Sequence, residues 1–213
     1  MKAVLVTGGT TRIGAAISAR LCAGGWRVLA TSHRVDAGAD IVADLAKPTG
    51  ADALYDAAMR LLGGRHPDAL VNNAALFTGD ATALRAVNLD APKRLTERMA
   101  AREESGGAVV NILDCKALKA PAPTATPYLL TKWGLLRETL SSARAFAKTL
   151  RVNAVAPGPV LAPTEVHEKA GRLLLHRRPS AEEVASVVAF LLSSASITGV
   201  SIPVDSGQHL LED

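Results

Sequence analysis

Two side chains in the second half of the chain have the types and the spacing needed to move a proton. Tyr128 and Lys132 are four residues apart, which places both on one face of a helix. A neighbouring ammonium favours the charged form of a phenol, so we expect Lys132 to lower the pKa of Tyr128. Such a tyrosine can act as a general acid or base. The same spacing also occurs on ordinary surface helices, so its meaning depends on the elements that position it.

A glycine-bearing loop near the amino terminus has the pattern of a phosphate-binding turn. The apolar run at residues 3–6 leads into this loop, and an amphipathic helix begins at Ile13. Gly8 allows a tight turn, and Gly14 allows the helix to pack closely on the sheet. The free N–H groups at such a helix start can bind a pyrophosphate. The strand–loop–helix order therefore predicts a dinucleotide site, although glycine also serves ordinary turns.

The stretch after the second predicted strand bears on the choice of dinucleotide. An acidic residue there would bind a ribose 2′-hydroxyl and repel a 2′-phosphate, but this chain has Ser32, His33 and Arg34. The first two can donate hydrogen bonds, and Arg34 can bind a phosphate with two N–H groups. Arg12 adds a second cation near the pyrophosphate. The sequence therefore predicts NADP(H) rather than NAD(H).

Strands and helices alternate along the whole chain. Apolar runs predict strands at residues 3–6, 27–31, 40–43, 69–71, 108–113, 151–155 and 200–204, and helical periodicity predicts helices at residues 13–23, 51–62, 81–103, 128–147 and 181–192. Ser180 and Glu183 form a predicted capping box at the last helix. This alternation favours a parallel sheet with helices on both faces.

The connection over residues 32–39 is the weak point of this pattern. It is too short for a crossover helix, so either a loop replaces that helix or the strand boundaries differ. A loop and a short helix are expected over residues 157–176.

Composition limits the class of protein. A chain of 213 residues with 48% hydrophobic content fits one domain over residues 1–213. No apolar run could span a bilayer, and the early first strand leaves no room for a signal peptide. Cys22 and Cys115 form neither a disulfide framework nor a metal site and are expected to be buried apolar residues. We therefore expect a cytoplasmic protein. The net charge of +4 comes from scattered side chains, which predicts neither nucleic-acid nor membrane partners.

Several motifs in order resemble the short-chain dehydrogenase/reductase family over essentially the full length. They are Thr7-Gly8-x-x-x-Arg12-Ile13-Gly14, Asn72-Asn73-Ala74-Ala75, Asn88, Tyr128-x-x-x-Lys132, Arg151-Val152-Asn153, Pro157-Gly158 and Ile197-Thr198-Gly199. The resemblance implies a single-domain Rossmann fold, with a doubly wound parallel sheet of about seven strands. It also implies a nicotinamide cofactor, no metal, and a catalytic group of Tyr128, Lys132 and Asn88. In that group, Asn88 would hold a water that relays protons to Lys132.

The resemblance and the residue chemistry together assign a cofactor site. Its residues are Gly8, Thr11, Arg12, Ile13, Gly14, Ser32, His33, Arg34, Asp44, Leu45, Asn73, Ala74, Ala75, Tyr128, Lys132, Pro157, Gly158 and Val160. Asp44 and Leu45 are expected to contact the adenine. The backbone over residues 157–161 is expected to hold the nicotinamide, and the loop over residues 162–178 to close over the substrate.

Two departures from the usual family pattern indicate the substrate. Arg12 stands where the family usually has glycine, and Asp114 stands where it usually has the catalytic serine. Both changes resemble pteridine reductases and bacterial dihydromonapterin reductases, which also have an aromatic residue where this chain has Phe77. A flat pterin could stack between Phe77 and the nicotinamide, whereas the alternative is that Phe77 is a core residue. The expected substrate-binding residues are Arg12, Phe77, Asp114 and Tyr128.

These observations predict an NADPH-dependent reductase that transfers hydride to a dihydropterin or dihydrofolate-type substrate. Asp114 and Tyr128 would supply the proton that the reduced nitrogen needs. One alternative is a carbonyl or 3-oxoacyl reductase of the same family, and another is a non-catalytic NADP(H)-sensing protein. The resemblance also implies a homo-oligomer, a dimer or tetramer, that pairs through the helices at residues 81–103 and 128–147. Gly134 would permit close helix approach there.

Overall fold

Seven parallel strands form one sheet in a computed structural model that describes residues 1–35, 37–160 and 172–211. The strands are β1 (Ala3–Val6), β2 (Arg27–Ser32), β3 (Ile41–Val42), β4 (Ala69–Asn72), β5 (Gly107–Ile112), β6 (Leu150–Pro157) and β7 (Ser201–Val204). Their order across the sheet is β3-β2-β1-β4-β5-β6-β7. The chain runs outward from β1 to β3 and then returns to β4 on the other side of β1. The predicted doubly wound parallel sheet is therefore confirmed.

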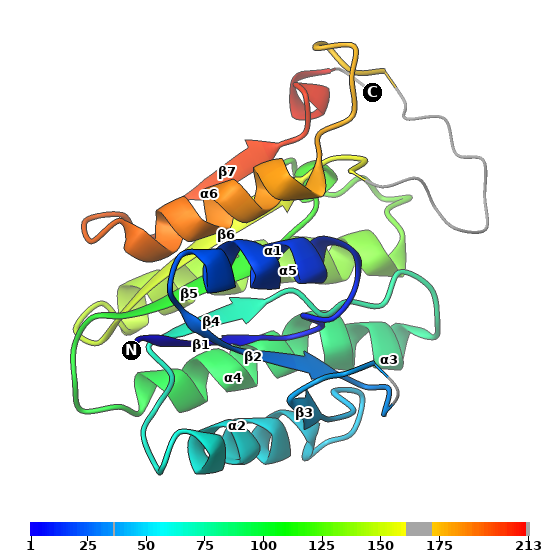
Figure 1. Cartoon of the computed structure of the whole chain (residues 1–213). Coiled ribbons are helices and arrows are strands. Elements are labelled where there is room, and N and C mark those ends of the chain that lie inside the picture. The colour runs from blue at the N-terminus through cyan, green and yellow to red at the C-terminus, as the bar shows by residue number, and fades with distance from the viewer. Residues whose placement is uncertain (36, 161–171, 212–213) are drawn as a thin grey trace.

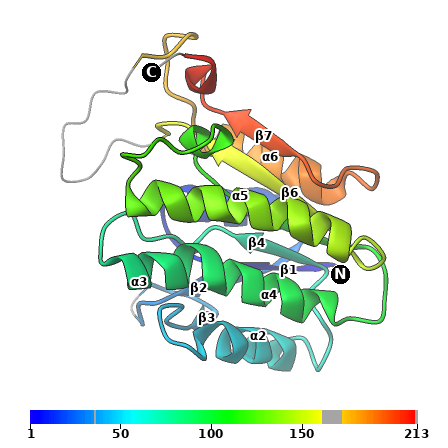
Figure 2. The ribbon, with the colours of Figure 1, turned by 180° about the vertical axis from the view of Figure 1, so that it is seen from behind.

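Helices cover both faces of this sheet (Figures 1 and 2). On one face lie α1 (Arg12–Ala23) and α6 (Ala181–Ser193). The other face is covered by α2 (Gly50–Leu61), α4 (Ala91–Ala100) and α5 (Pro127–Ala145), with α3 (Ala81–Arg85) leading into α4.

Successive strand residues point to opposite faces, so each strand contributes to two cores. Val4 and Val6 pack with the α1 and α6 side chains, whereas Leu5 packs with those of α2 and α4.

The helix predicted over residues 81–103 is interrupted. Asp80 caps α3 by accepting hydrogen bonds from the backbone N–H groups of Thr82 and Ala83. A π-helical segment, η1 (Ala86–Asp90), then joins α3 to α4, which ends at Ala100. Single π-helical turns inside helices are frequent at functional sites. Here the turn carries Asn88.

The connection between β2 and β3 contains no helix among the residues that the structure describes there. The carboxylate of Asp40 instead accepts a hydrogen bond of 2.8 Å from the backbone N–H of Ala30, and β3 has only two residues. A loop has therefore replaced the crossover helix, and the third strand is shorter than predicted. This leaves the end of β2 open beside the glycine-bearing loop.

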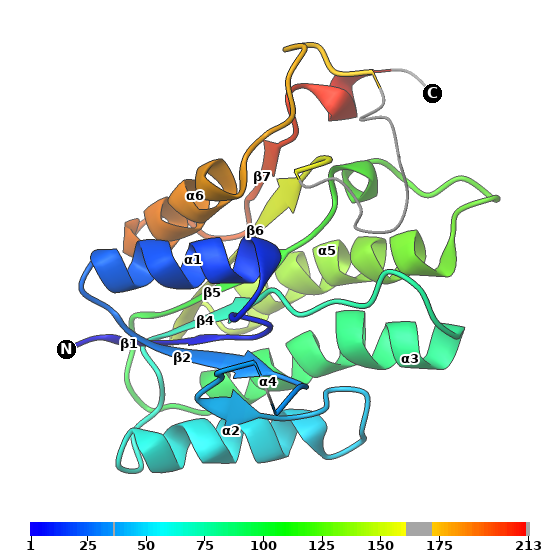
Figure 3. The same cartoon turned by 45° about the vertical axis from the view of Figure 1, so that its right-hand side comes forward.

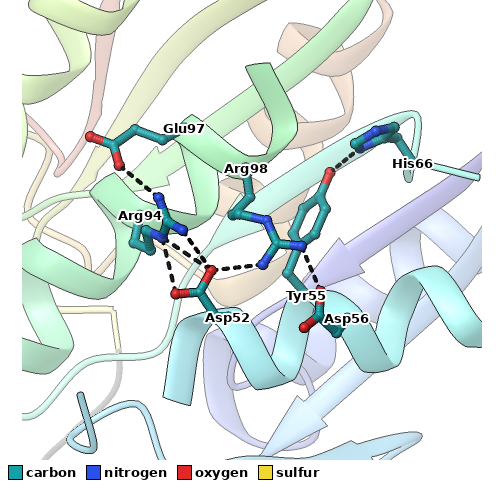
Figure 4. A network of polar contacts seen from close by, with 7 residues as sticks. All are labelled: Asp52, Tyr55, Asp56, His66, Arg94, Glu97 and Arg98. Carbon is teal, nitrogen blue, oxygen red and sulfur yellow. Dashed lines mark hydrogen bonds and ion pairs between the residues drawn. The ribbon is translucent and has the colours of Figure 1, made fainter. Parts of the chain in front are cut away.

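A polar network fastens α2 to α4 on the outer face (Figure 4). Asp52 pairs with Arg94 at 2.9 Å and with Arg98 at 2.7 Å, and Arg98 also contacts Asp56. The Arg98 guanidinium lies 4.9 Å from the ring centre of the buried Tyr55. The network lies away from the glycine-bearing loop and holds two helices of the scaffold together.

Two smaller expectations have opposite outcomes. Ser180 and Glu183 form the predicted capping box at the start of α6. Cys115 is buried as expected, but Cys22 is exposed on α1, so its predicted burial is wrong.

No helix in the described part of the chain is long and apolar enough to cross a membrane.

Candidate active site

Two cavities meet at the carboxyl ends of the strands, between β1 and β4, where the order of successive strands across the sheet changes direction. Figure 3 shows this end of the sheet together with the first turns of α1 and α5. The cavities measure about 360 Å³ and 480 Å³, and both are lined by Gly8, Thr11, His33, Ala74 and Ala75. Open α/β sheets bind their ligands at such switch points.

The first cavity contains the predicted catalytic pair and most of the predicted glycine loop. Its lining residues are Gly8, Thr11, Arg12, Ile13, Gly14, His33, Asn73, Ala74, Ala75, Ile112, Leu113, Asp114, Tyr128, Lys132, Pro157 and Gly158. Tyr128 and the glycine loop are far apart in sequence, and it is the fold that brings them to the same cavity.

At one side of the cavity, the backbone of the glycine loop lies very close to the start of α1 and to Asn73. Gly8 has a φ of 61°, and a Cβ on Gly14 would lie 2.0 Å from the Gly8 carbonyl oxygen. No larger residue fits at Gly14 without moving the loop. The Asn73 side chain donates hydrogen bonds of 3.0 Å to the carbonyl oxygens of Thr7 and Gly8. These contacts fix the loop before any ligand arrives.

The amino terminus of α1 is left open for an anion. The N-cap residue Thr11 makes no side-chain capping bond, and the first turn contains no acidic residue. Helix α6 differs in both respects, because it has a capping box and two acidic residues in its first turn. Uncapped N–H groups at a helix start attract phosphate. With uncapped N–H groups and no acidic residue in its first turn, the start of α1 therefore has the features that pyrophosphate binding needs.

Arg12 has an unusual backbone conformation at this helix start. Its φ is 53°, in the left-handed region that favours glycine. This explains why a glycine is the usual residue at such a position. Conformations of this kind cost energy and are concentrated at functional sites.

The second cavity receives the residues that the sequence assigns to the adenosine end of the cofactor. Its lining residues include Ser32, His33, Arg34, Asp44 and Leu45. The Ser32 hydroxyl accepts a hydrogen bond of 3.0 Å from the Arg34 backbone N–H. Asp44 is the single acid among the described lining residues. The wall near the end of β2 thus carries a hydroxyl, an imidazole and a guanidinium.

The hydroxyl of Tyr128 points at the carboxylate of Asp114. It donates a hydrogen bond of 3.3 Å to Asp114 Oδ2, while Oδ1 accepts one of 2.9 Å from the Lys116 backbone N–H. Burial, and then the Asp114 carboxylate, raise the pKa of Tyr128 well above its ordinary value. The expectation that Lys132 lowers this pKa is therefore wrong. Tyr128 is protonated at neutral pH and is an acid.

The Lys132 ammonium is held by the backbone at the end of β5. It donates a hydrogen bond of 2.8 Å to the Ile112 carbonyl oxygen, and it lies 5.9 Å from the centre of the Tyr128 ring. Burial lowers the pKa of Lys132 to about 8, and Asp114 opposes that shift. The lysine is thus placed beneath the ring.

The side-chain amide of Asn88 is committed to structural contacts. It is fully buried, exchanges two hydrogen bonds of 2.8 Å with the backbone of Leu76, and donates one of 3.1 Å to Thr131 Oγ1. Thr131 in turn donates to the Tyr128 carbonyl oxygen. Asn88 therefore links the segment after β4 to the first turn of α5. The water relay from Asn88 to Lys132 stays a prediction.

Phe77 is not a core residue. Its side chain is 71% exposed, and its ring centre lies 4.8 Å from that of Tyr128. The phenylalanine thus stands beside the acid, although it lines neither cavity.

The fold leaves one predicted cofactor residue outside the cavities, and it engages the end of the predicted substrate loop in other contacts. Val160 is buried against the α1–α6 core and lines neither cavity. Arg177 pairs with Glu183 at 2.6 Å, and Arg178 donates a hydrogen bond to the Pro159 carbonyl oxygen. Residues 161–171, which include most of the loop expected to close over the substrate, lie outside the described residues.

Sequence reasoning missed one residue that builds the site. The Thr7 hydroxyl is buried and accepts hydrogen bonds of 2.9 Å and 3.0 Å from the backbone N–H groups of Asn73 and Ala74. It therefore fixes the end of β4 against the end of β1. The available signal was a hydroxyl residue between an apolar strand and its first glycine.

The chain is similar to known proteins over nearly its whole length. Residues 9–209 match the family model described as enoyl-(acyl carrier protein) reductase. The structure of FolM alternative dihydrofolate reductase 1 from Brucella canis, complexed with NADP, has a TM-score of 0.87 and 32% identity, covering 100% of this chain and 95% of that one. For the Brucella suis protein, also in complex with NADP, these values are 0.86, 34%, 99% and 96%. Coniferyl-alcohol dehydrogenase of Pseudomonas sp. strain HR199 is 28% identical, covering 97% of this chain and 96% of that protein.

Proposed function

Because the chain belongs to the short-chain dehydrogenase/reductase family of NAD(P)-dependent oxidoreductases, we propose that it is an NADPH-dependent pteridine reductase. The observation that carries this proposal is the hydrogen bond from Tyr128 to Asp114, at a position where the family usually has serine. Phe77 beside Tyr128 offers a face for a flat ring. The likeness to proteins named alternative dihydrofolate reductases supports the same substrate class.

The residues of the two cavities fit NADPH. The uncapped start of α1, with Arg12, would bind the pyrophosphate, and Arg34 with Ser32 and His33 would bind the 2′-phosphate. Pro157 and Gly158 line the cavity beside Tyr128 and would hold the nicotinamide. When bound, the nicotinamide supplies the hydride to a ring carbon next to an imine nitrogen of the substrate.

The protein's own part of the reaction is to protonate that nitrogen. A tyrosine is protonated at neutral pH, and burial and Asp114 raise the pKa of Tyr128 further, so it holds a proton that it can donate as the nitrogen gains electron density. The Lys132 ammonium beneath the ring would stabilise the phenolate that remains. Asp114 accepts the hydrogen bond of the hydroxyl and keeps the phenol oriented, and the phenolate takes its next proton from solvent. A carboxylate at this position suits the protonation of a nitrogen better than it suits the binding of a carbonyl oxygen.

The test is NADPH oxidation with 7,8-dihydropterin, quinonoid dihydropterin, dihydrofolate and a 3-oxoacyl thioester, repeated with NADH. We expect turnover on a pteridine with NADPH. Tyr128→Phe should abolish turnover and leave NADPH binding nearly unchanged. The matched control is Tyr55→Phe, at the other tyrosine of the chain, and it should remain active. Activity that survives in Tyr128→Phe would contradict the assignment of the acid.

The panel also separates two alternatives. Turnover on the thioester alone would favour a 3-oxoacyl or other carbonyl reductase, a possibility that the coniferyl-alcohol dehydrogenase relative keeps open. NADPH binding without any turnover would favour a non-catalytic NADP(H) sensor.

We further infer that two copies pair through α5. Leu130, which is 48% exposed, lies on the outer surface of this helix, and farther along is a groove of about 550 Å³ lined by Arg137, Leu140, Ser141, Arg144 and Ala145. Gly134 does not serve this contact, because a Cβ there would lie 3.0 Å from Leu89 of the same chain. The close approach at Gly134 is thus an internal one, between α5 and η1.

A further inference from the structure

The turn after β7 is tied together by one buried carboxylate. Asp205 is 3% exposed. Its Oδ1 accepts a hydrogen bond of 3.0 Å from the Gly207 N–H, and Oδ2 accepts bonds from the backbone N–H and the ring Nδ1 of His209. Ser206 and Gly207 consequently adopt left-handed conformations. This geometry fixes the short 3₁₀-helix η3 (Gln208–Leu210).

The same turn is joined to the nicotinamide side of the cavity. The Gly158 N–H donates a hydrogen bond of 3.0 Å to the Val204 carbonyl oxygen, immediately before Asp205. Movements of the turn and of the cavity wall at Gly158 are therefore coupled through the end of the sheet.

On its other side the turn meets the segment that carries Asp114. The 3₁₀-helix η2 (Cys115–Leu118) begins directly after Asp114, which caps it through the Lys116 N–H. The Cys115 thiol donates a hydrogen bond of 3.1 Å to Gln208 Oε1, across 93 positions of sequence. Burial raises the pKa of Cys115 to about 12, so the sulfur keeps its hydrogen. Lys119 just after η2 also contacts the Leu211 carbonyl oxygen.

From this chain of contacts we propose that Gln208 is a positioning residue for Asp114. It holds η2 through Cys115, and η2 holds the carboxylate 3.3 Å from the Tyr128 hydroxyl. Asp205 anchors Gln208 to the wall that carries Gly158, so the proton-donating pair keeps one position relative to the cofactor cavity. The catalytic meaning of this role rests on the proposed reductase function, whereas its structural content does not.

The first test measures geometry without turnover. The chain has two tyrosines, so a protein labelled with ¹³Cζ-tyrosine gives two signals, which Tyr55→Phe assigns. Asp114→Ala gives the Tyr128 chemical shift without a carboxylate partner. We expect Gln208→Ala at pH 7 to move the Tyr128 signal towards that reference. The matched control, Leu210→Ala, replaces an exposed residue of the same 3₁₀-helix and should leave the signal unchanged.

The second test is a double-mutant cycle on kcat with NADPH and the pteridine found active. Gln208→Ala and Cys115→Ala should each lower kcat about tenfold, since small misplacements of reacting groups are costly, with the KM for NADPH unchanged. The double variant should lose no more than either single variant. Cys115→Ser keeps a hydrogen-bond donor and should remain close to wild type.

Two results would overturn the proposal. One is an unchanged Tyr128 signal in Gln208→Ala at an unchanged melting temperature, and the other is additive losses in the cycle. A wild-type protein that reduces no pteridine would instead contradict the proposed function, and the chemical-shift comparison would still decide the role of Gln208.

Discussion

At the scale of single residues, the site combines an acid with a strained cation. Burial and the carboxylate of Asp114 both raise the pKa of Tyr128, so both favour the protonated phenol. Arg12 occupies a left-handed conformation with a φ of 53° that a glycine would adopt at little cost. Strain of this kind is concentrated at functional sites, and this agrees with our assignment of the Arg12 guanidinium to an anion.

Two substitutions of Arg12 separate strain from charge. Arg12→Gly removes both, so we expect the free energy of unfolding to rise by about 1 kcal/mol while the affinity for NADPH falls. Arg12→Ala removes the charge but keeps a Cβ in the strained conformation, so affinity should fall without the gain in stability. Urea unfolding and calorimetric titration with NADPH measure the two effects. Equal stability of the two variants would contradict the assignment of strain.

At the scale of elements, ion pairs on the outer face add to the apolar packing of α2 against α4. Asp52 receives hydrogen bonds from Arg94 and Arg98, which lower its pKa, and both arginines lie on α4. The capping contrast between α1 and α6 belongs to the same scale. One helix start closes itself with Ser180 and Glu183, while the other is open where the ligand is expected.

We expect Asp52→Asn to lower the free energy of unfolding at pH 7 by roughly 0.5 to 1 kcal/mol, because the pairs are partly exposed and screened by salt. A carboxyl whose pKa is lowered by folding stabilises the protein above its unfolded pKa. That stabilisation is lost as the pH falls through the folded value. The difference between variant and wild type should therefore shrink below about pH 4. Urea unfolding at pH 7 and pH 3 checks this, with Asp90→Asn as the control at an exposed pair. An equal difference at both pH values would rule out this account.

At the scale of the whole molecule, the sheet order creates the site and leaves one helix face open. Because the order of successive strands changes direction between β1 and β4, the glycine loop and the start of helix α5 open onto one cavity. Helix α5 also exposes Leu130 and carries the groove beside Leu140, and this is the surface that we assign to a second copy.

Leu140→Asp tests that surface at the end of α5 remote from Tyr128. We expect the variant to be monomeric by size-exclusion chromatography with light scattering, whereas wild type should be a dimer or tetramer, because burying a carboxylate in the contact costs more desolvation free energy than pairing with Arg137 or Arg144 returns. Leu61→Asp places the same charge at an exposed leucine of α2 and should not change the assembly. A monomeric wild type would refute the pairing.

The sequence by itself determined most of the fold and predicted which residues line one cavity. Hydrophobic periodicity and turn residues are local signals, so the strands, the capping box at Ser180 and the glycine loop could be placed without coordinates. Motif order then assigned Tyr128, Lys132 and Asp114 to one site, and the structure brings them to one cavity.

Only the tertiary structure decided how these groups act on one another. The raised pKa of Tyr128, the structural contacts of Asn88 and the exposure of Phe77 depend on packing between elements distant in sequence. The bond between Cys115 and Gln208 spans 93 positions, and no periodicity within either segment encodes it. Spacing along one helix places two residues on the same face, but burial and the nearest charge set their protonation, and both are properties of the folded chain.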